Sequence, residues 1–167
     1  RVPIQGWFAQ EDQFAMGPFF EPASSIRRFQ IASPSIIGLK GVQASYKMIE
    51  EAGIATIAHK AALGTELMLQ LFDAWLARLG FGLITPRDAN QRGGHITVTH
   101  QDAKQIAAAL RKFSKVVPDF RAPNGIRLAI APLPTSYLEV YDGFARIKEL
   151  VETRKYQELQ LDGNRVT

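Results

Sequence analysis

The spacing of apolar residues predicts two long helices in the first half of the chain. Ser33-Pro34-Ser35 supplies a start signal, and apolar residues then recur every three or four positions as far as the Gly53 stop. A second stripe begins near Ile54 and ends at Gly80. Its apolar positions are Ile57, Ala61, Leu67, Leu71, Phe72, Trp75, Leu76 and Leu79. We interpret Met68 and Trp75 on this helix as core residues rather than ligands.

Beyond Gly80 the apolar period changes to that of strands. Residues 81–86 and 95–100 are expected to form strands, and the second alternates with period two. A short helix is expected over 102–113. Two more strands, within 116–121 and 126–133, are joined by Pro123-Asn124-Gly125, where the Asn-Gly pair is expected to supply positive φ angles.

A capping box predicts the start of the last helix. Ser136 and Glu139 have the required spacing, and apolar residues follow at helical intervals to about Leu159. The element order is therefore helix, helix, strand, strand, helix, strand, strand, helix. This order is typical of an α+β fold in which helices cover one face of a small, mainly antiparallel sheet.

In residues 1–34 the apolar positions follow neither the helical nor the strand period. These residues are rich in Phe, Pro, Gly and Ser and are expected to form a long loop. So many rings would make a large exposed apolar patch, so we expect this loop to pack on another part of the protein. Residues 35–160 are expected to form the α+β domain, and 161–167 a tail. Because the chain starts at Arg1 rather than Met, we also expect that further protein precedes it.

Composition excludes several kinds of site and function. The chain has 167 residues, 46% of them apolar, and no cysteine, which excludes disulfides, thiolate metal sites and cysteine nucleophiles. The net charge is +4, but the cations are scattered, so nucleic-acid binding is not expected. No stretch resembles a membrane helix or a signal peptide, and we expect a cytoplasmic protein.

The histidines and a glycine pair are weak site candidates. His95 and His100 lie five positions apart on one strand and would point to opposite faces, while His59 is alone on a helix, so no metal site is expected. Gly93-Gly94 could present N–H groups to a phosphate, but the pair equally marks the start of a strand. No nucleophile and base pair is evident, so no catalytic residue is predicted.

Arg127 is the stronger candidate. In residues 125–131, Ile126, Leu128 and Ile130 form the apolar face of a strand, so Arg127 points the other way beside small alanines. A guanidinium held there suits a two-bond fork to a carboxylate. An exposed arginine with no ligand remains the alternative from periodicity alone.

Four ordered motifs resemble the C-terminal portion of the kynureninase family. They are Gly6-Trp7-Phe8, the run from Arg28 to Ile36, Arg92-Gly93-Gly94-His95, and the run from Asp119 to Arg127. The resemblance implies a homodimeric hydrolase of the aspartate-aminotransferase fold type (fold type I), dependent on pyridoxal phosphate. Such an enzyme cleaves the Cβ–Cγ bond of L-kynurenine, or its 3-hydroxy form, to anthranilate and L-alanine in tryptophan catabolism, which feeds NAD biosynthesis.

The resemblance also implies roles for three residues. Arg127 matches the arginine that holds the substrate carboxylate. Trp7 and Ser33 match residues that contact the cofactor region from the neighbouring subunit. The chain departs from the family at Ala9-Gln10, where Gly-His is usual, so a contact to the substrate ring is in doubt.

The family's Schiff-base lysine, its acidic partner for the pyridine nitrogen and most phosphate ligands lie upstream of the Trp7 motif. We therefore expect this segment to represent the end of the large domain (1–34) and the small domain (35–160). Alone, it should neither hold the cofactor nor turn over kynurenine. The alternatives are a non-catalytic carboxylate-binding or dimerisation domain, and another enzyme of fold type I such as a cysteine desulfurase.

Overall fold

The computed structural model describes residues 4–160 and divides the chain into two compact units, Arg1–Glu51 and Ala52–Thr167. We call these the N-terminal unit and the C-terminal unit and describe each by itself. The limits predicted at residues 34 and 160 remain predictions. The predicted tail, 161–167, lies outside the described residues.

The N-terminal unit is mainly loop, as its sequence predicts, with two short 3₁₀ turns. These are η1 (Trp7–Ala9) and η2 (Ile26–Phe29), and an isolated bridge joins Gln10 to Pro22. The predicted first helix is present as α1 (Ile36–Ala52), which has no buried residue. Its apolar stripe, including Leu39 and Tyr46, is exposed. This surface has the composition of a contact face rather than of a solvated one.

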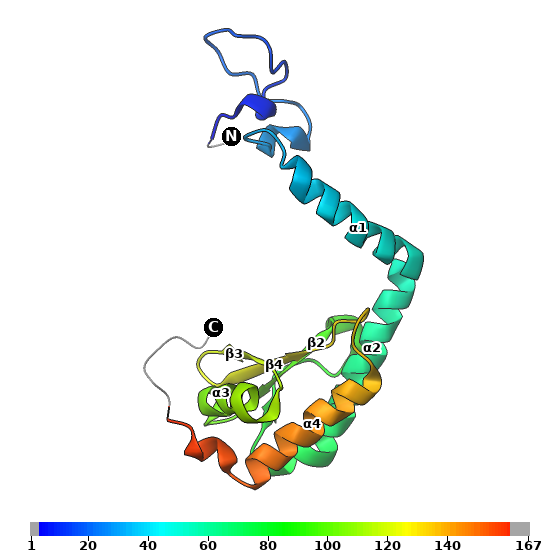
Figure 1. Cartoon of the computed structure of the whole chain (residues 1–167), viewed down its shortest axis with the longest axis vertical. Helices are drawn as coiled ribbons and strands as arrows, with labels where there is room; N and C mark the ends of the chain where they lie inside the picture. Colours follow the sequence, from blue (N-terminus) through cyan, green and yellow to red (C-terminus); the bar gives the residue numbers. More distant parts are fainter. Residues whose placement is uncertain (1–3, 161–167) are drawn as a thin grey trace. The chain divides into compact units, whose positions relative to one another are not determined.

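The C-terminal unit has the predicted order of elements (Figure 1). Its helices and strands are α2 (Ile54–Leu71), β1 (Gly82–Leu83), β2 (His95–Thr99), α3 (Ala103–Ser114), β3 (Asp119–Arg121), β4 (Gly125–Ala129) and α4 (Tyr137–Glu152). Residues after α2 continue as a π turn, η3 (Phe72–Leu76), and a 3₁₀ turn, η4 (Ala77–Leu79). The helical run ends at Gly80, whose φ of 86° is left-handed, as a glycine stop allows.

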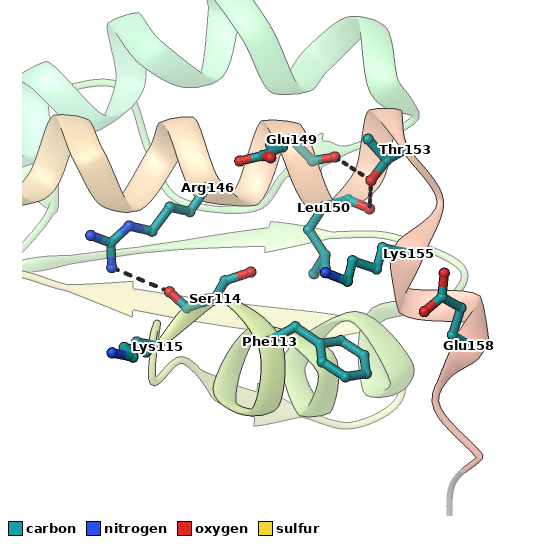
Figure 2. A pocket seen from close by; sticks show the side chains of 9 residues that line it. All are labelled: Phe113, Ser114, Lys115, Arg146, Glu149, Leu150, Thr153, Lys155 and Glu158. Atoms are coloured by element: carbon teal, nitrogen blue, oxygen red, sulfur yellow. Dashed lines mark hydrogen bonds between the residues drawn. The ribbon is translucent and has the colours of Figure 1, made fainter.

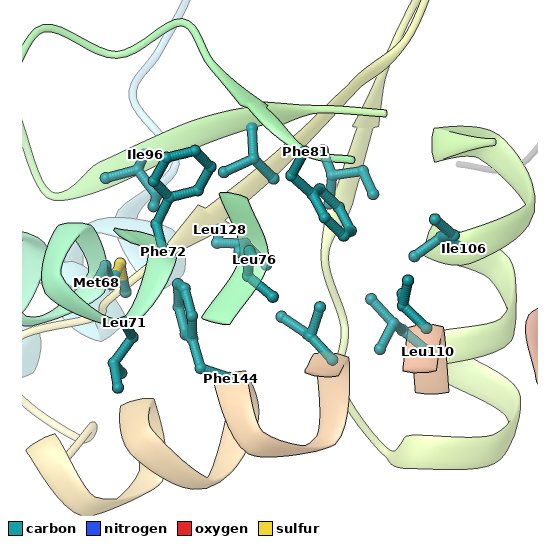
Figure 3. Packing of buried hydrophobic residues seen from close by; sticks show 14 of the residues in the cluster. Met68, Leu71, Phe72, Leu76, Phe81, Ile96, Ile106, Leu110, Leu128 and Phe144 are labelled. Atoms are coloured by element: carbon teal, nitrogen blue, oxygen red, sulfur yellow. The ribbon is translucent and has the colours of Figure 1, made fainter. Parts of the chain in front are cut away.

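The four strands form one antiparallel sheet in the order β1-β2-β4-β3. Ile96 and Val98 of β2 and Ile126 and Leu128 of β4 point to the same face and are buried. Figure 3 shows how side chains from α2, η3, α3 and α4 pack with them, among them Phe72, Leu76, Leu110 and Phe144. The fold is therefore α+β, with a helical layer on one face of the sheet.

The last helix is capped as predicted but is shorter. Ser136 Oγ accepts from Glu139 N at 3.2 Å, and the Glu139 carboxylate accepts from Ser136 N at 2.7 Å. These bonds hold the pKa of Glu139 below its usual value. The predicted extension to Leu159 is wrong: α4 ends at Glu152 because Arg154 adopts a left-handed φ of 54°, and a separate turn, η6 (Lys155–Glu158), follows.

The hairpin between β3 and β4 is present, but its turn differs from the prediction. Neither Asn124 nor Gly125 has a positive φ, so the predicted turn geometry is wrong. The Ala122–Pro123 peptide is cis, and a cis proline is the mark of a different class of turn, in which the reversal does not require positive φ at an Asn-Gly pair.

Two helical glycines should respond oppositely to substitution. A methyl group at Gly64 in α2 would meet Ile130 Cδ1 at 2.6 Å, whereas one at Gly143 in α4 has nothing within 4 Å. Gly64→Ala should therefore lower the free energy of unfolding by about 1–3 kcal/mol. Gly143→Ala should raise it by about 0.5–1 kcal/mol. Urea denaturation of both variants measures the free energy of unfolding. If both substitutions changed it equally, Gly64 would not be in close contact with Ile130.

Candidate functional site

Arg127 lies on the sheet face opposite the helical layer. In the strand register it pairs with Thr97 on one side and Asp119 on the other, and both neighbours therefore share its face. The flanking Ile126 and Leu128 are buried on the other face. Its side chain is 37% exposed. The orientation predicted for Arg127 from alternation is therefore present in the structure.

The guanidinium of Arg127 already has one anionic partner. Nη2 donates to Asp119 Oδ2 at 2.6 Å, and the same oxygen accepts from Arg121 Nη2 at 2.5 Å. Two cations thus share one carboxylate, and the group keeps one excess positive charge. Two residues beyond Asp119 on β3, Arg121 pairs with Gly125 of β4, which adds no side chain to this face. Such a face can attract a further small anion.

Trp7 and Ser33 belong to the N-terminal unit, where a glycine brings their segments together. Gly6 is buried, and a methyl group there would lie 2.2 Å from Ile31 O and 2.4 Å from Ile31 Cα. The backbone before Trp7 thus touches the backbone just before Ser33. Trp7 is 50% exposed, and its indole Nε1 donates to Gln13 O. Ser33 is exposed. Arg127, in contrast, belongs to the C-terminal unit.

Arg92 is a buried structural arginine that the sequence did not single out by itself. Its side chain is only 2% exposed. Nε donates to Thr65 Oγ1 at 3.2 Å, Nη2 to Glu66 Oε2 at 2.6 Å, and Nη1 to Arg87 O. It therefore ties the connection before β2 to α2. The only signal in the sequence was that Arg92-Gly93-Gly94-His95 is one of the four motifs that resemble the family.

The connection before β2 also carries an exposed ion pair, between Arg87 and Asp73. Arg87 forms a two-bond fork with the Asp73 carboxylate, at 2.7 and 2.8 Å, and this bond holds the pKa of Asp73 below its usual value. Gly94 O accepts from Ile130 N, which extends the ladder between β2 and β4. Gly94 thus lies at the start of a strand, which is one of the two interpretations given for the Gly93-Gly94 pair.

The histidines differ in their surroundings, and the prediction that one strand carries both His95 and His100 is wrong, because β2 ends at Thr99. His95 is exposed, while His100 is 8% exposed and its Nδ1 accepts from Asp102 N at 3.0 Å. Tyr156 OH donates to Asp102 Oδ2 at 3.0 Å, and burial together with this bond raises the pKa of Tyr156. Within residues 4–160, no group of three or more His, Cys, Asp or Glu is placed to hold a metal ion.

A cleft of about 650 Å³ lies elsewhere in the C-terminal unit, between α3, α4 and η6 (Figure 2). Phe113 and Leu150 supply its apolar lining, and Arg146 Nη1 donates to Ser114 O at 3.2 Å. Lys155 lies with its Nζ 5.5 Å from the centre of the Phe113 ring. Neither Arg127, Trp7 nor Ser33 lines this cleft, so it is not the site that the sequence motifs indicate.

Together these features define a class: a small α+β domain that presents an arginine cluster on the open face of its sheet. The family model of the kynureninase C-terminal domain matches residues 57–147, which include α2 from Ile57 onward, the whole sheet and Arg127. The chain belongs to this kynureninase C-terminal domain family. No described helix is both long and apolar enough to cross a membrane.

Curated relatives agree with the family match. The kynureninase of Geobacillus thermodenitrificans is 35% identical over 156 residues, which cover 92% of this chain and 36% of that protein. The kynureninases of Bacillus thuringiensis and Shouchella clausii are 34% and 33% identical, and the matches cover 96% of this chain and 38% of each relative. The chain thus spans a little over a third of the relatives it matches.

Replacing Arg92 should destabilise the C-terminal unit strongly. Arg92→Ala leaves Thr65 and Glu66 without their shared donor, so we expect the free energy of unfolding to fall by about 2–4 kcal/mol. Arg92→Lys should recover only part of this, because an ammonium cannot make three separated bonds.

Arg78→Ala is the matched control. Arg78 is 61% exposed and lies 3.9 Å from Glu152, so its loss should change stability by no more than about 0.5 kcal/mol. Chemical denaturation monitored by circular dichroism measures both. An Arg92→Ala variant as stable as Arg78→Ala would contradict the structural role of Arg92.

Proposed function

We propose that this chain is the C-terminal segment of a kynureninase-like hydrolase of fold type I. The complete enzyme would cleave the Cβ–Cγ bond of L-kynurenine, or of 3-hydroxykynurenine, to anthranilate and L-alanine. The observation that carries the proposal is Arg127, which lies within the matched residues 57–147, at the position where the motif resembles the family's substrate-binding arginine, and whose side chain is 37% exposed on the sheet face opposite the helices.

The role proposed for Arg127 is to hold the substrate carboxylate. A guanidinium binds a carboxylate through two parallel hydrogen bonds, which fixes direction as well as position. Holding the carboxylate would also fix how the substituents of the substrate Cα are oriented when the cofactor is bound in the complete enzyme. This orientation selects the bond that reacts. The segment thus contributes substrate orientation rather than bond chemistry.

Pyridoxal phosphate would supply an electron sink for cleavage in the complete enzyme. The strands that carry Arg127 have no lysine. Three lysines of the chain lie over aromatic rings, Lys112 and Lys155 over Phe113 and Lys148 over Trp75. Because the chain spans a little over a third of its relatives, we assign the cofactor lysine to the part of the enzyme that this chain does not span.

The N-terminal unit supports a role in contacts to other parts of the enzyme. Its rings and the stripe of α1 are exposed, among them Trp7 (50%), Phe14 (67%), Phe19 (86%) and Tyr46 (65%). A surface this apolar is typical of an interface. We propose that it packs on the missing large domain and on the partner subunit of a cytoplasmic homodimer. Trp7 and Ser33 would then reach the cofactor region across the dimer.

Trp7 could serve there only after a local change. Its indole N–H donates to Gln13 O in this structure, and an N–H contact to a phosphate would replace that bond. Ser33 needs no such change, because it is exposed and makes no hydrogen bond through its hydroxyl to any described residue.

Arg127→Ala tests the central assignment in a full-length kynureninase that carries this chain as its C-terminal part. Loss of a charge-assisted fork should raise KM for kynurenine by about 10- to 100-fold. The absorbance of the bound cofactor should stay unchanged, because Arg127 is not proposed to touch it. The KM of Arg127→Lys should lie between those of the original enzyme and Arg127→Ala, because lysine keeps the charge and loses the two-bond fork.

The Arg78→Ala variant serves as the control for the loss of an exposed arginine on the same unit. Steady-state kinetics and an absorbance spectrum of each variant complete the test. Unchanged KM in Arg127→Ala would refute the carboxylate role, while lost cofactor absorbance would instead place Arg127 in the cofactor site.

A further inference from the structure

Asp119 holds Arg127 in a way that a freely exposed arginine would lack. The two residues are direct partners in the register of β3 and β4, and Nη2 of Arg127 donates to Asp119 Oδ2 at 2.6 Å. Their side chains are 37% and 40% exposed. A pair this exposed adds little to stability. Its main physical consequence is therefore to restrict the orientation of the guanidinium.

The bond to Asp119 leaves most of the guanidinium available. No residue within 4–160 accepts a hydrogen bond from Nε or Nη1 of Arg127. A carboxylate ligand needs two parallel N–H donors, and in a guanidinium each such pair includes one N–H of Nη2. The bond to Asp119 uses one of the two N–H groups of Nη2, so the second one, together with either Nε or Nη1, leaves one two-donor edge for a ligand. Asp119 thus restricts the orientation of the guanidinium and leaves this edge available.

Arg121 offsets the charge of Asp119. Its Nη2 donates to the same Oδ2 at 2.5 Å. Gly125, opposite Arg121, leaves the space that this arrangement needs, since a methyl group there would lie 3.0 Å from Arg121 O and 3.2 Å from Arg121 Cβ. An arriving carboxylate therefore meets one net positive charge rather than a neutral pair.

We propose that Asp119 is a positioning residue for Arg127, which it holds in the orientation that binds a carboxylate ligand within the cluster of Arg121, Asp119 and Arg127. The inference rests on the proposed carboxylate role of Arg127.

Acetate is the probe that tests this on the full 167-residue chain. The ¹⁵N-labelled chain is titrated with sodium acetate, against sodium chloride at equal ionic strength, and the Nε–Hε signal of Arg127 is followed by NMR. Arg127→Lys, which removes this signal, assigns it. Asp119→Ala should weaken acetate binding about fivefold and increase the mobility of the Arg127 side chain.

Asp119→Asn is the conservative variant that separates positioning from charge. Its amide oxygen can still accept from Nη2, so acetate affinity should stay within about twofold of the original or increase, and the Arg127 side chain should remain ordered.

The outcomes separate this inference from the proposed function. If Arg127→Ala leaves acetate binding to the chain unchanged, the carboxylate role of Arg127 itself fails. If Arg127→Ala abolishes binding while Asp119→Ala binds acetate as tightly as the original chain or more tightly, Asp119 is a competitor or a bystander and only the present inference is overturned. Should Asp119→Ala not fold, Asp119→Ser against Asp119→Asn makes the same comparison.

Discussion

Burial of one face of strand β4 fixes the direction of every other residue on it. β4 lies between β2 and β3, and Ile126 and Leu128 are held against the helical layer. A slip of one residue in the register would expose both of these side chains and bury the charge of Arg127. The hydrophobic effect on one face therefore positions the guanidinium on the other, and the candidate site depends on the core for its geometry.

Much of this arrangement follows from local sequence signals. The order of helices and strands, the capping box at Ser136 and the outward direction of Arg127 each depend on short-range periodicity, and all three are present in the structure. The failures involve backbone conformations that side-chain pattern does not encode. Arg154 adopts a left-handed conformation within an apparently helical run, and the turn before Gly125 contains a cis peptide.

The contacts of the site residues could not be predicted from the sequence, for a different reason. The pair of Asp119 and Arg127 depends on which residues face each other across two strands, and the buried bonds of Arg92 join positions 26 and 27 residues apart. Such contacts require the register and the packing of α2. The ordered motifs indicated that these segments matter, but not that Arg92 is structural while Arg127 is accessible.

The division of labour in the proposed enzyme follows from the same features. The C-terminal unit has a complete core and presents an arginine cluster, whereas the N-terminal unit exposes many rings and the stripe of α1. In the proposed function the first unit would orient a carboxylate from a strand that is held by the core. The second has the surface expected of a segment that is buried only in the complete protein, which in the curated relatives is nearly three times as long as the matched region.

Reconstitution tests this account most directly. The chain is mixed with the separately produced N-terminal portion of the Geobacillus thermodenitrificans kynureninase and pyridoxal phosphate, and anthranilate release from kynurenine is followed by fluorescence. We predict activity only from the combination, and its loss at low substrate when the chain carries Arg127→Ala. Anthranilate release by this chain alone, or a combination that is equally active with and without Arg127, would contradict the account.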